Sequence, residues 1–298
     1  DGDCDDGGPG AEYGSCLGNG GYGTDCLDCG GRVALTPSAP YPYPPPSPPL
    51  VPSPPCHPRG LIPVATIAHL RDHMAMTPRH GSLSVYVPEG TVFSVDSYIM
   101  VTAIDLLIAS DGAGATFDAQ YRSRFFSVNE GARLWLESVT LTRGDMAYGG
   151  AMMIGLANVT LIRTTITDSH ARYRGGGVLL SYGTLTLLDN CLITGCIARQ
   201  GYGGALHVRM GARATIDHSS LVSSTASEMG GAVYALNAIL TVTNGSSLID
   251  CSASQQGGGI CLYAVTTRVA NSSIIRCSAQ DSHGGAMRIA GGVVAVTG

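Results

Sequence analysis

The sequence contains no lysine, and charged residues make up only 13% of its 298 positions. All 17 basic residues are arginine and the net charge is −5, so the chain offers no basic stripe for nucleic acid. No run of 18 apolar residues occurs, so no membrane-spanning helix is expected. Aromatic residues reach only 6%, with one Trp and four Phe, and their scattered positions predict no groove of stacked aromatic rings.

The chain has instead 41 glycines, and a glycine pair returns at nearly constant spacing. The last glycine of each aligned pair recurs every 26 to 28 residues, which is too regular for chance and indicates a structural repeat. We expect these repeat glycines to stack in one column. They are Gly150, Gly177, Gly204, Gly231, Gly259 and Gly285.

A second element keeps phase with the glycine pair, with the pattern aliphatic-x-x-Cys/Ser-x-Ala in residues 248–253 and 274–279. Between the two elements lie alternating β-branched runs, such as residues 239–243, which predict about three short strands per unit and no helix. A unit of ~27 residues cannot bury its own apolar face, but stacked units can, since each strand pairs in parallel with the strand one coil away. The sequence therefore predicts an all-β parallel β-helix.

With its glycine pair followed by Ala or Ile and its later aliphatic-x-x-Cys/Ser element, the unit resembles the repeats of chlamydial polymorphic membrane proteins. More broadly, residues 61–298 look like the right-handed, pectin-lyase-like parallel β-helix. The repeats depart from the chlamydial pattern where that family has Phe-x-x-Asn. The resemblance implies a right-handed fold but no single function, because this fold carries lyases, hydrolases, adhesins and inert shafts.

Residues 1–35 are predicted to form a small disulfide module rich in Cys, Asp and Gly. So short a segment has no core, and two disulfides among Cys4, Cys16, Cys26 and Cys29 are favoured over a zinc site, which would prefer two Cys-x-x-Cys pairs. Acidic residues also follow the spacing of a calcium-binding loop, and a solvated acidic loop is the alternative. The ligands of this Ca²⁺ would be Asp1, Asp3, Asp5 and Glu12. No other cofactor is expected.

Residues 36–58 are a proline-rich segment that is predicted to form a stiff polyproline II rod or linker. Twelve of the 16 prolines lie here, and such a run forms neither helix nor sheet. The Ser-Pro-Pro pattern resembles the hydroxyproline-rich glycoproteins of algal and plant walls, which implies covalent glycans. The candidate positions are Pro42, Pro44, Pro45, Pro46, Ser47, Pro48, Pro49, Ser53, Pro54 and Pro55.

Residues 59–107 are predicted to form the N-terminal cap and the first coil, because the apolar end of a solenoid has to be covered. A short helix over residues 62–70 and strands over residues 82–87 and 91–95 are expected within it. Residues 108–298 are predicted to form the remaining coils of the β-helix.

Three polar residues of the coils, Asp189, Asp217 and His218, align at one corner of neighbouring coils and are the best candidates for catalysis. The simpler interpretation is that Asp at a turn accepts backbone N–H bonds. No catalysis is therefore predicted.

Two further features concern covalent chemistry. Cys251 and Cys277 occupy equivalent positions on neighbouring coils ~4.8 Å apart, a spacing that fits a disulfide or a column of buried thiols equally well. Three sequons predict N-linked glycans on corners of the coils. Their acceptors are Asn158, Asn244 and Asn271.

The sequence begins without Met and stops within a coil that has no polar cap. An uncovered coil exposes unpaired backbone groups, which favours either a trimmed product or a head-to-tail contact with a second copy. The contact residues would be Met287, Ile289, Val294 and Val296. We therefore expect an extracellular structural glycoprotein, a subunit of a surface fibre or wall layer whose partners are its own copies and covalent glycans. The alternatives are a surface adhesin or glycan-binding shaft, and a polysaccharide lyase or hydrolase.

Overall fold

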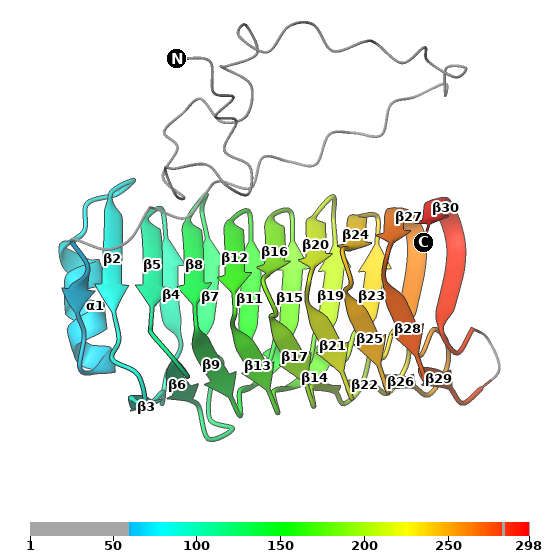
Figure 1. The fold of residues 1–298 in the computed structure, drawn as a ribbon, viewed down its shortest axis with the longest axis horizontal. Helices are drawn as coiled ribbons and strands as arrows, with labels where there is room; N and C mark the ends of the chain where they lie inside the picture. Colours follow the sequence, from blue (N-terminus) through cyan, green and yellow to red (C-terminus); the bar gives the residue numbers. More distant parts are fainter. Residues whose placement is uncertain (1–59, 282–283, 298) are drawn as a thin grey trace, which may run out of the picture. The chain divides into compact units, whose positions relative to one another are not determined.

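The computed structural model describes residues 60–281 and 284–297. The predicted disulfide module, its calcium ligands and the proline-rich segment lie outside the described residues. Pairing between the described strands is parallel throughout, and the strands stack coil upon coil into a solenoid of about nine turns (Figure 1). The predicted all-β parallel β-helix with ~27-residue coils is confirmed.

The coils carry four rows of strands, not the three expected, because a short strand precedes the glycine pair. The first row, which follows that pair, contains β4 (Ile99–Thr102), β7 (Phe126–Asn129), β11 (Met152–Gly155), β15 (Val178–Ser181), β19 (Leu206–Arg209) and β23 (Val233–Leu236). The second row contains β1 (Ile62–Pro63), β2 (Ser82–Tyr86), β5 (Asp105–Ala109), β8 (Arg133–Glu137), β12 (Asn158–Ile162), β16 (Thr184–Leu188), β20 (Arg213–Asp217) and β24 (Ile239–Thr243). Both rows continue into the long strands β27 (Ile260–Ala270) and β30 (Met287–Thr297).

The other two rows are made of shorter strands. The third row contains β3 (Val92–Ser94), β6 (Ala115–Asp118), β9 (Val139–Thr142), β13 (Thr165–Thr167), β17 (Leu192–Thr194), β21 (Ser220–Val222), β25 (Ser247–Ile249) and β28 (Ser273–Ile275). The fourth row contains β10 (Asp145–Tyr148), β14 (His170–Arg174), β18 (Ile197–Ala198), β22 (Thr225–Ala226), β26 (Ser252–Ala253) and β29 (Ser278–Ala279).

One helix, α1 (Ile67–Met76), lies at the N-terminal end of the stack (Figure 1). It begins several residues later than predicted, because Val64 still donates a backbone hydrogen bond to Tyr86 at 2.8 Å and so continues the pairing of β1 with β2. The side chain of Thr66 then caps the helix by accepting from the backbone of His69 at 3.1 Å. Leu70 is fully buried, so the helix is anchored in the same core as the coils. Among the described residues no helix is long and apolar enough to cross a membrane.

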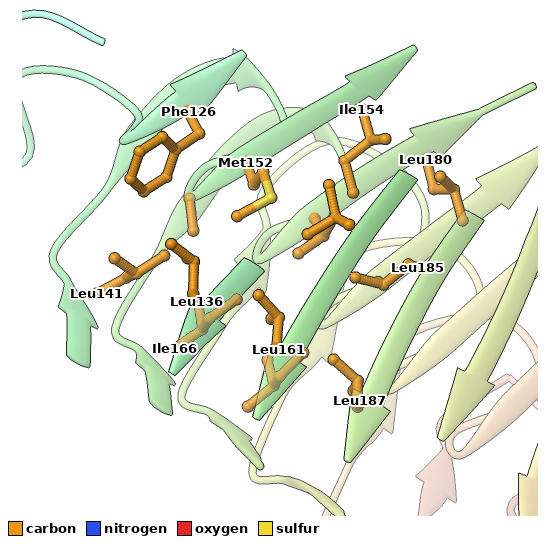
Figure 2. Close-up of a cluster of buried hydrophobic side chains, with 14 of the residues drawn as sticks. Phe126, Leu136, Leu141, Met152, Ile154, Leu161, Ile166, Leu180, Leu185 and Leu187 are labelled. Atoms are coloured by element: carbon orange, nitrogen blue, oxygen red, sulfur yellow. The ribbon is translucent and has the colours of Figure 1, made fainter. Parts of the chain in front are cut away.

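The core is a set of aliphatic columns that run along the solenoid axis. Leu136, Leu161 and Leu187 occupy the same register position on β8, β12 and β16 and point into the interior (Figure 2). The column continues through Ile216 and Val242, and none of the five is measurably exposed. Burying one such side chain stabilises the fold by roughly 1.5–3 kcal/mol, and the repeat multiplies that gain coil by coil.

The strand register corrects the predicted glycine column at two positions. The residues that stack are Gly150, Gly176, Gly204, Gly231, Gly258 and Gly285. Gly177 and Gly259 lie one residue further on, at the position that alanine takes in the other coils. In a Gly-Gly-Gly run the first two glycines make the corner, because a Cβ on Gly176 would overlap the carbonyl oxygen of Gly204. The overlap is smaller at Gly177, where a Cβ would lie 2.8 Å from the carbonyl oxygen of Ala205.

A ladder of small side chains, which includes Cys251 and Cys277, lines the corner after the third row. Cys251 and Cys277 are free thiols in this structure. Each donates instead to the carbonyl two residues earlier, Ile249 at 3.4 Å and Ile275 at 3.6 Å. Ser169, Cys196 and Ser224 make the same contact in the preceding coils. The thiols therefore replace serine hydroxyls in a ladder of turn-closing hydrogen bonds.

Candidate functional site

The outer face of the first row carries a cluster of aromatic side chains. Side chains alternate along a strand, so in β19 Leu206 and Val208 face the core while His207 and Arg209 face outward. Tyr234 on β23 and Tyr263 on β27 face outward at nearby register positions. Tyr202, which precedes the glycine pair of its coil, reaches over this face because Gly203 adopts a left-handed φ of 70° and turns the chain.

The rings of these residues form a ladder along the axis. The ring centroids of Tyr202 and Tyr234 lie 4.8 Å apart, and those of Tyr234 and Tyr263 lie 5.8 Å apart. His207 packs against Tyr234 at 5.0 Å. The expectation that the aromatic residues are too scattered to form such a groove was wrong. It missed the ladder because the three tyrosines differ in their place within the repeat, and only the fold brings them together.

A cleft of about 210 Å³ opens beside the ladder. Its walls include Arg174, Tyr202, His207, Arg209, Tyr234 and Leu236. We refer to it as the tyrosine–arginine cleft. Aromatic rings supply one part of its lining and two guanidinium groups supply another, so it combines flat apolar surface with positive charge.

His207 is the buried polar group of this cleft. Only 2% of the residue is exposed, and its Nδ1 atom is buried with no hydrogen-bond partner among the described residues. Burial, followed by the charges of Arg174 and Arg209, lowers the pKa of His207 to about 3. The imidazole is therefore neutral at neutral pH, and its free nitrogen can serve a ligand as a hydrogen-bonding group.

Arg174 and Arg209 provide the positive charge of the cleft. Arg209 Nε donates to the Ser181 hydroxyl at 3.0 Å, and within residues 60–281 and 284–297 neither arginine forms an ion pair with a carboxylate. Burial first, and then the charge of Arg174, lowers the pKa of Arg209. The nearby carboxylate, Glu228, hydrogen-bonds Tyr202 and raises the pKa of that phenol.

The corner predicted as the best catalytic candidate is built differently. The Asp217 carboxylate accepts from Asn244 Nδ2 at 3.0 Å and lies 2.9 Å from His218 Nδ1. Asp189, on the neighbouring coil, lies 3.9 Å from an Arg163 guanidinium nitrogen. In the part of the chain that the structure describes, no three His, Cys, Asp or Glu side chains are arranged to hold a metal ion. These residues make a network of corner contacts on an exposed surface.

The predicted glycosylation and assembly residues lie at the surface. The acceptors Asn158, Asn244 and Asn271 are all exposed. On β30, Ile289 and Val296 are 45% and 67% exposed, while Met287 and Val294 pack partly against the core. N-linked glycans and contacts between copies remain predictions.

Comparisons with known proteins found no matching family model, no similar curated protein and no similar solved structure. The resemblances to chlamydial repeats, to pectin-lyase-like proteins and to hydroxyproline-rich glycoproteins therefore rest on short motifs alone. The parallel solenoid itself rests on the strand pairing.

Proposed function

We propose that this chain is a glycan-binding shaft of a cell surface or wall, with the tyrosine–arginine cleft as its binding face. The tyrosine ladder is the observation that carries the proposal, because a row of tilted aromatic rings along one face favours a glycan-binding shaft over an inert one. Flat aromatic faces pack well against the apolar faces of sugar rings, and tyrosine adds a hydroxyl for the polar edge.

The direction of the ladder supports an extended ligand. Tyr202, Tyr234 and Tyr263 come from three successive coils, and coils in a parallel β-helix are stacked ~4.8 Å apart. Tyr263 is held in place by a hydrogen bond from its hydroxyl to Gln256 Oε1 at 3.2 Å. A saccharide chain lying along the axis would contact the rings in turn, so affinity is expected to rise with chain length.

A structural role in an extracellular fibre or wall layer is the second candidate, and it is compatible with binding. It is favoured by the regular aliphatic columns of the core, which make the solenoid a rigid spacer, and by the exposure of all three sequons. Head-to-tail contacts through Met287, Ile289, Val294 and Val296 and covalent glycans belong to this proposal. We propose binding without turnover, since the acidic corner of Asp217 is engaged by neighbouring side chains.

The test is affinity electrophoresis of the full chain in gels that contain wall or matrix polysaccharides, followed by calorimetry with oligosaccharides of increasing length. Tyr202→Ala and Tyr234→Leu remove the ring faces and are expected to abolish the retardation. Tyr121→Ala is the matched control, because Tyr121 is 44% exposed and stacks on His170 outside the cleft. Thermal unfolding of each variant shows that the fold is kept. Unchanged retardation of both cleft variants would reject the glycan-binding function.

A further inference from the structure

The charges around the cleft narrow the class of ligand. Several arginines of the solenoid contact a carboxylate of another coil, as Arg133 does with Asp105 at 2.7 Å and Arg276 with Asp250 at 2.6 Å. Arg174 and Arg209 have no such ion pair within the described residues, and both line the same cleft. Two guanidinium groups that face the same space repel each other, and an anion between them would relieve that repulsion.

The buried imidazole points to the same kind of ligand. His207 Nδ1 is shielded from solvent and has no partner in the described part of the chain, and a buried polar atom of this kind is costly unless something binds it. Its ring packs against Tyr234, and both residues line the cleft. Glu228 is the acidic group near the cleft; its carboxylate accepts a hydrogen bond from Tyr202 and forms no ion pair with either arginine among the described residues.

We propose that the tyrosine–arginine cleft binds an acidic saccharide, whose carboxylate or sulfate ester is held by Arg174 and Arg209 while its ring packs on Tyr202 and Tyr234. This inference rests on the proposed glycan-binding function and adds the charge of the ligand to it. Guanidinium groups suit both anions, because their planar donors match two oxygens at once. The cleft volume of about 210 Å³ leaves room for one sugar unit at this position.

The experiment uses the full chain and two matched pairs of oligosaccharides in calorimetry. One pair is an oligouronide and the same oligouronide after reduction of its carboxyl groups. The other is a sulfated oligogalactan and its desulfated form. We expect one acidic member to bind about tenfold more tightly than its neutral partner, with an affinity that falls as salt is raised. The pair that shows the difference identifies carboxylate or sulfate as the anion.

Three variants assign the charge preference to the cleft. Arg174→Gln combined with Arg209→Gln is expected to abolish the difference between acidic and neutral members while the binding that depends on Tyr234 remains. The corresponding double Lys variant keeps the charge and is expected to retain part of the preference, which separates charge from folding. Arg268→Gln is the control, since Arg268 is exposed on β27 and does not line the cleft.

The outcomes separate the two proposals. Equal binding of acidic and neutral members by the unaltered chain overturns the inference and leaves the glycan-binding function intact. A charge preference that survives the double Gln variant also overturns it, because the anion then binds elsewhere. If no saccharide of either pair binds, and no polysaccharide retards the chain, both proposals are rejected together.

Discussion

The early coils and the later coils of this solenoid differ in whether aromatic side chains fill the core. All four phenylalanines of the sequence, Phe93, Phe117, Phe125 and Phe126, lie in the early coils and are buried in the core. In the later coils the core is aliphatic, and the aromatic rings of Tyr202, Tyr234 and Tyr263 stand on the outer face. Aromatic residues thus stabilise one half and build the candidate site in the other.

The corners explain part of this difference. Arg124 occupies the register position that Gly150 and Gly176 take in later coils, and bulky Phe125 and Phe126 follow it. Where the glycine pair is present, backbones of neighbouring coils approach so closely that a Cβ would collide with a carbonyl. The corner is then closed by glycine alone, and aliphatic side chains suffice to fill the interior.

Removing an aromatic ring from the early core should give the largest effect. Phe117 is fully buried and packs edge-on to Phe93, with 5.1 Å between ring centroids. Phe117→Ala is expected to lower the free energy of unfolding by about 3–5 kcal/mol, measured by urea denaturation. Leu187→Ala in the later core is the matched variant, and a loss there equal to or larger than that of Phe117→Ala would contradict the special weight of the early core.

Two alanine substitutions, at neighbouring glycines, test the corner of the later coils. Gly176→Ala places a Cβ against the backbone of Gly204 and Ile197, so it is expected to cost about 1–3 kcal/mol of unfolding free energy. Gly177→Ala adds a methyl group where Ala151 and Ala205 stand in adjacent coils, and its cost should be smaller. Urea denaturation of the two variants measures the difference. Equal losses of unfolding free energy would contradict the corrected glycine register.

The repeat could be predicted from the sequence because it depends on local requirements. The spacing of the glycine pairs and the aliphatic-x-x-Cys/Ser element both follow from a corner that each coil must make. The helix boundary was less predictable, since strand pairing of Val64 with Tyr86 displaced it toward Thr66. The sequence alone could not tell which glycine of Gly175-Gly176-Gly177 stacks on Gly150. Only the strand pairing between neighbouring coils shows that it is Gly176.

The candidate site could not be predicted in the same way. Tyr202 stands before its glycine pair, Tyr234 is the second residue of β23, and Tyr263 lies two residues further along the equivalent strand. These positions share no place in the repeat, so no periodicity marks them. One feature of the sequence did point to the site: a polar residue, His207, stands at a strand position that Leu179 and Tyr234 occupy in the adjacent coils.

The outer face of the later coils should also make stability depend on pH. His207 is packed against Tyr202 and Tyr234 and faces Arg174 and Arg209, and its pKa falls from the ordinary 6.5 to about 3. The unfolded chain therefore binds a proton that the folded chain rejects, so stability is lost as pH falls below 6.5. The loss is about 1.4 kcal/mol per pH unit, or roughly 2 kcal/mol at pH 5.

His207→Phe should flatten this dependence between pH 7 and pH 5 relative to the unaltered chain, as measured by urea denaturation at each pH. Carboxylates with lowered pKa values, such as Asp118 beside Arg143 and Asp250 beside Arg276, also stabilise the fold less as the pH falls further. Their contribution is common to both proteins and cancels in the difference. Parallel pH curves for the two proteins would show that His207 is not the buried titrating group.

The smallest effect on stability is expected in the thiol ladder of the later coils. Cys251 follows Ser224 in the same column, so Cys251→Ser keeps the turn-closing hydrogen bond and should change the unfolding free energy by less than about 1 kcal/mol. Hydrogen bonding to Cys251 lowers the pKa of the partly exposed Cys277, whereas burial raises the pKa of Cys196 to about 12.

Iodoacetamide at pH 7 should therefore alkylate Cys277 first among the five described cysteines, as read by peptide mass spectrometry. Cys251→Ala removes the hydrogen bond that favours the Cys277 thiolate, and the alkylation rate is expected to fall about tenfold. Cys191→Ser is the control, because Cys191 belongs to a different corner and contacts the carbonyl of Leu188. A Cys277 rate that is unchanged in Cys251→Ala, or no faster than that of Cys196, would mean that the two thiols are not coupled across neighbouring coils.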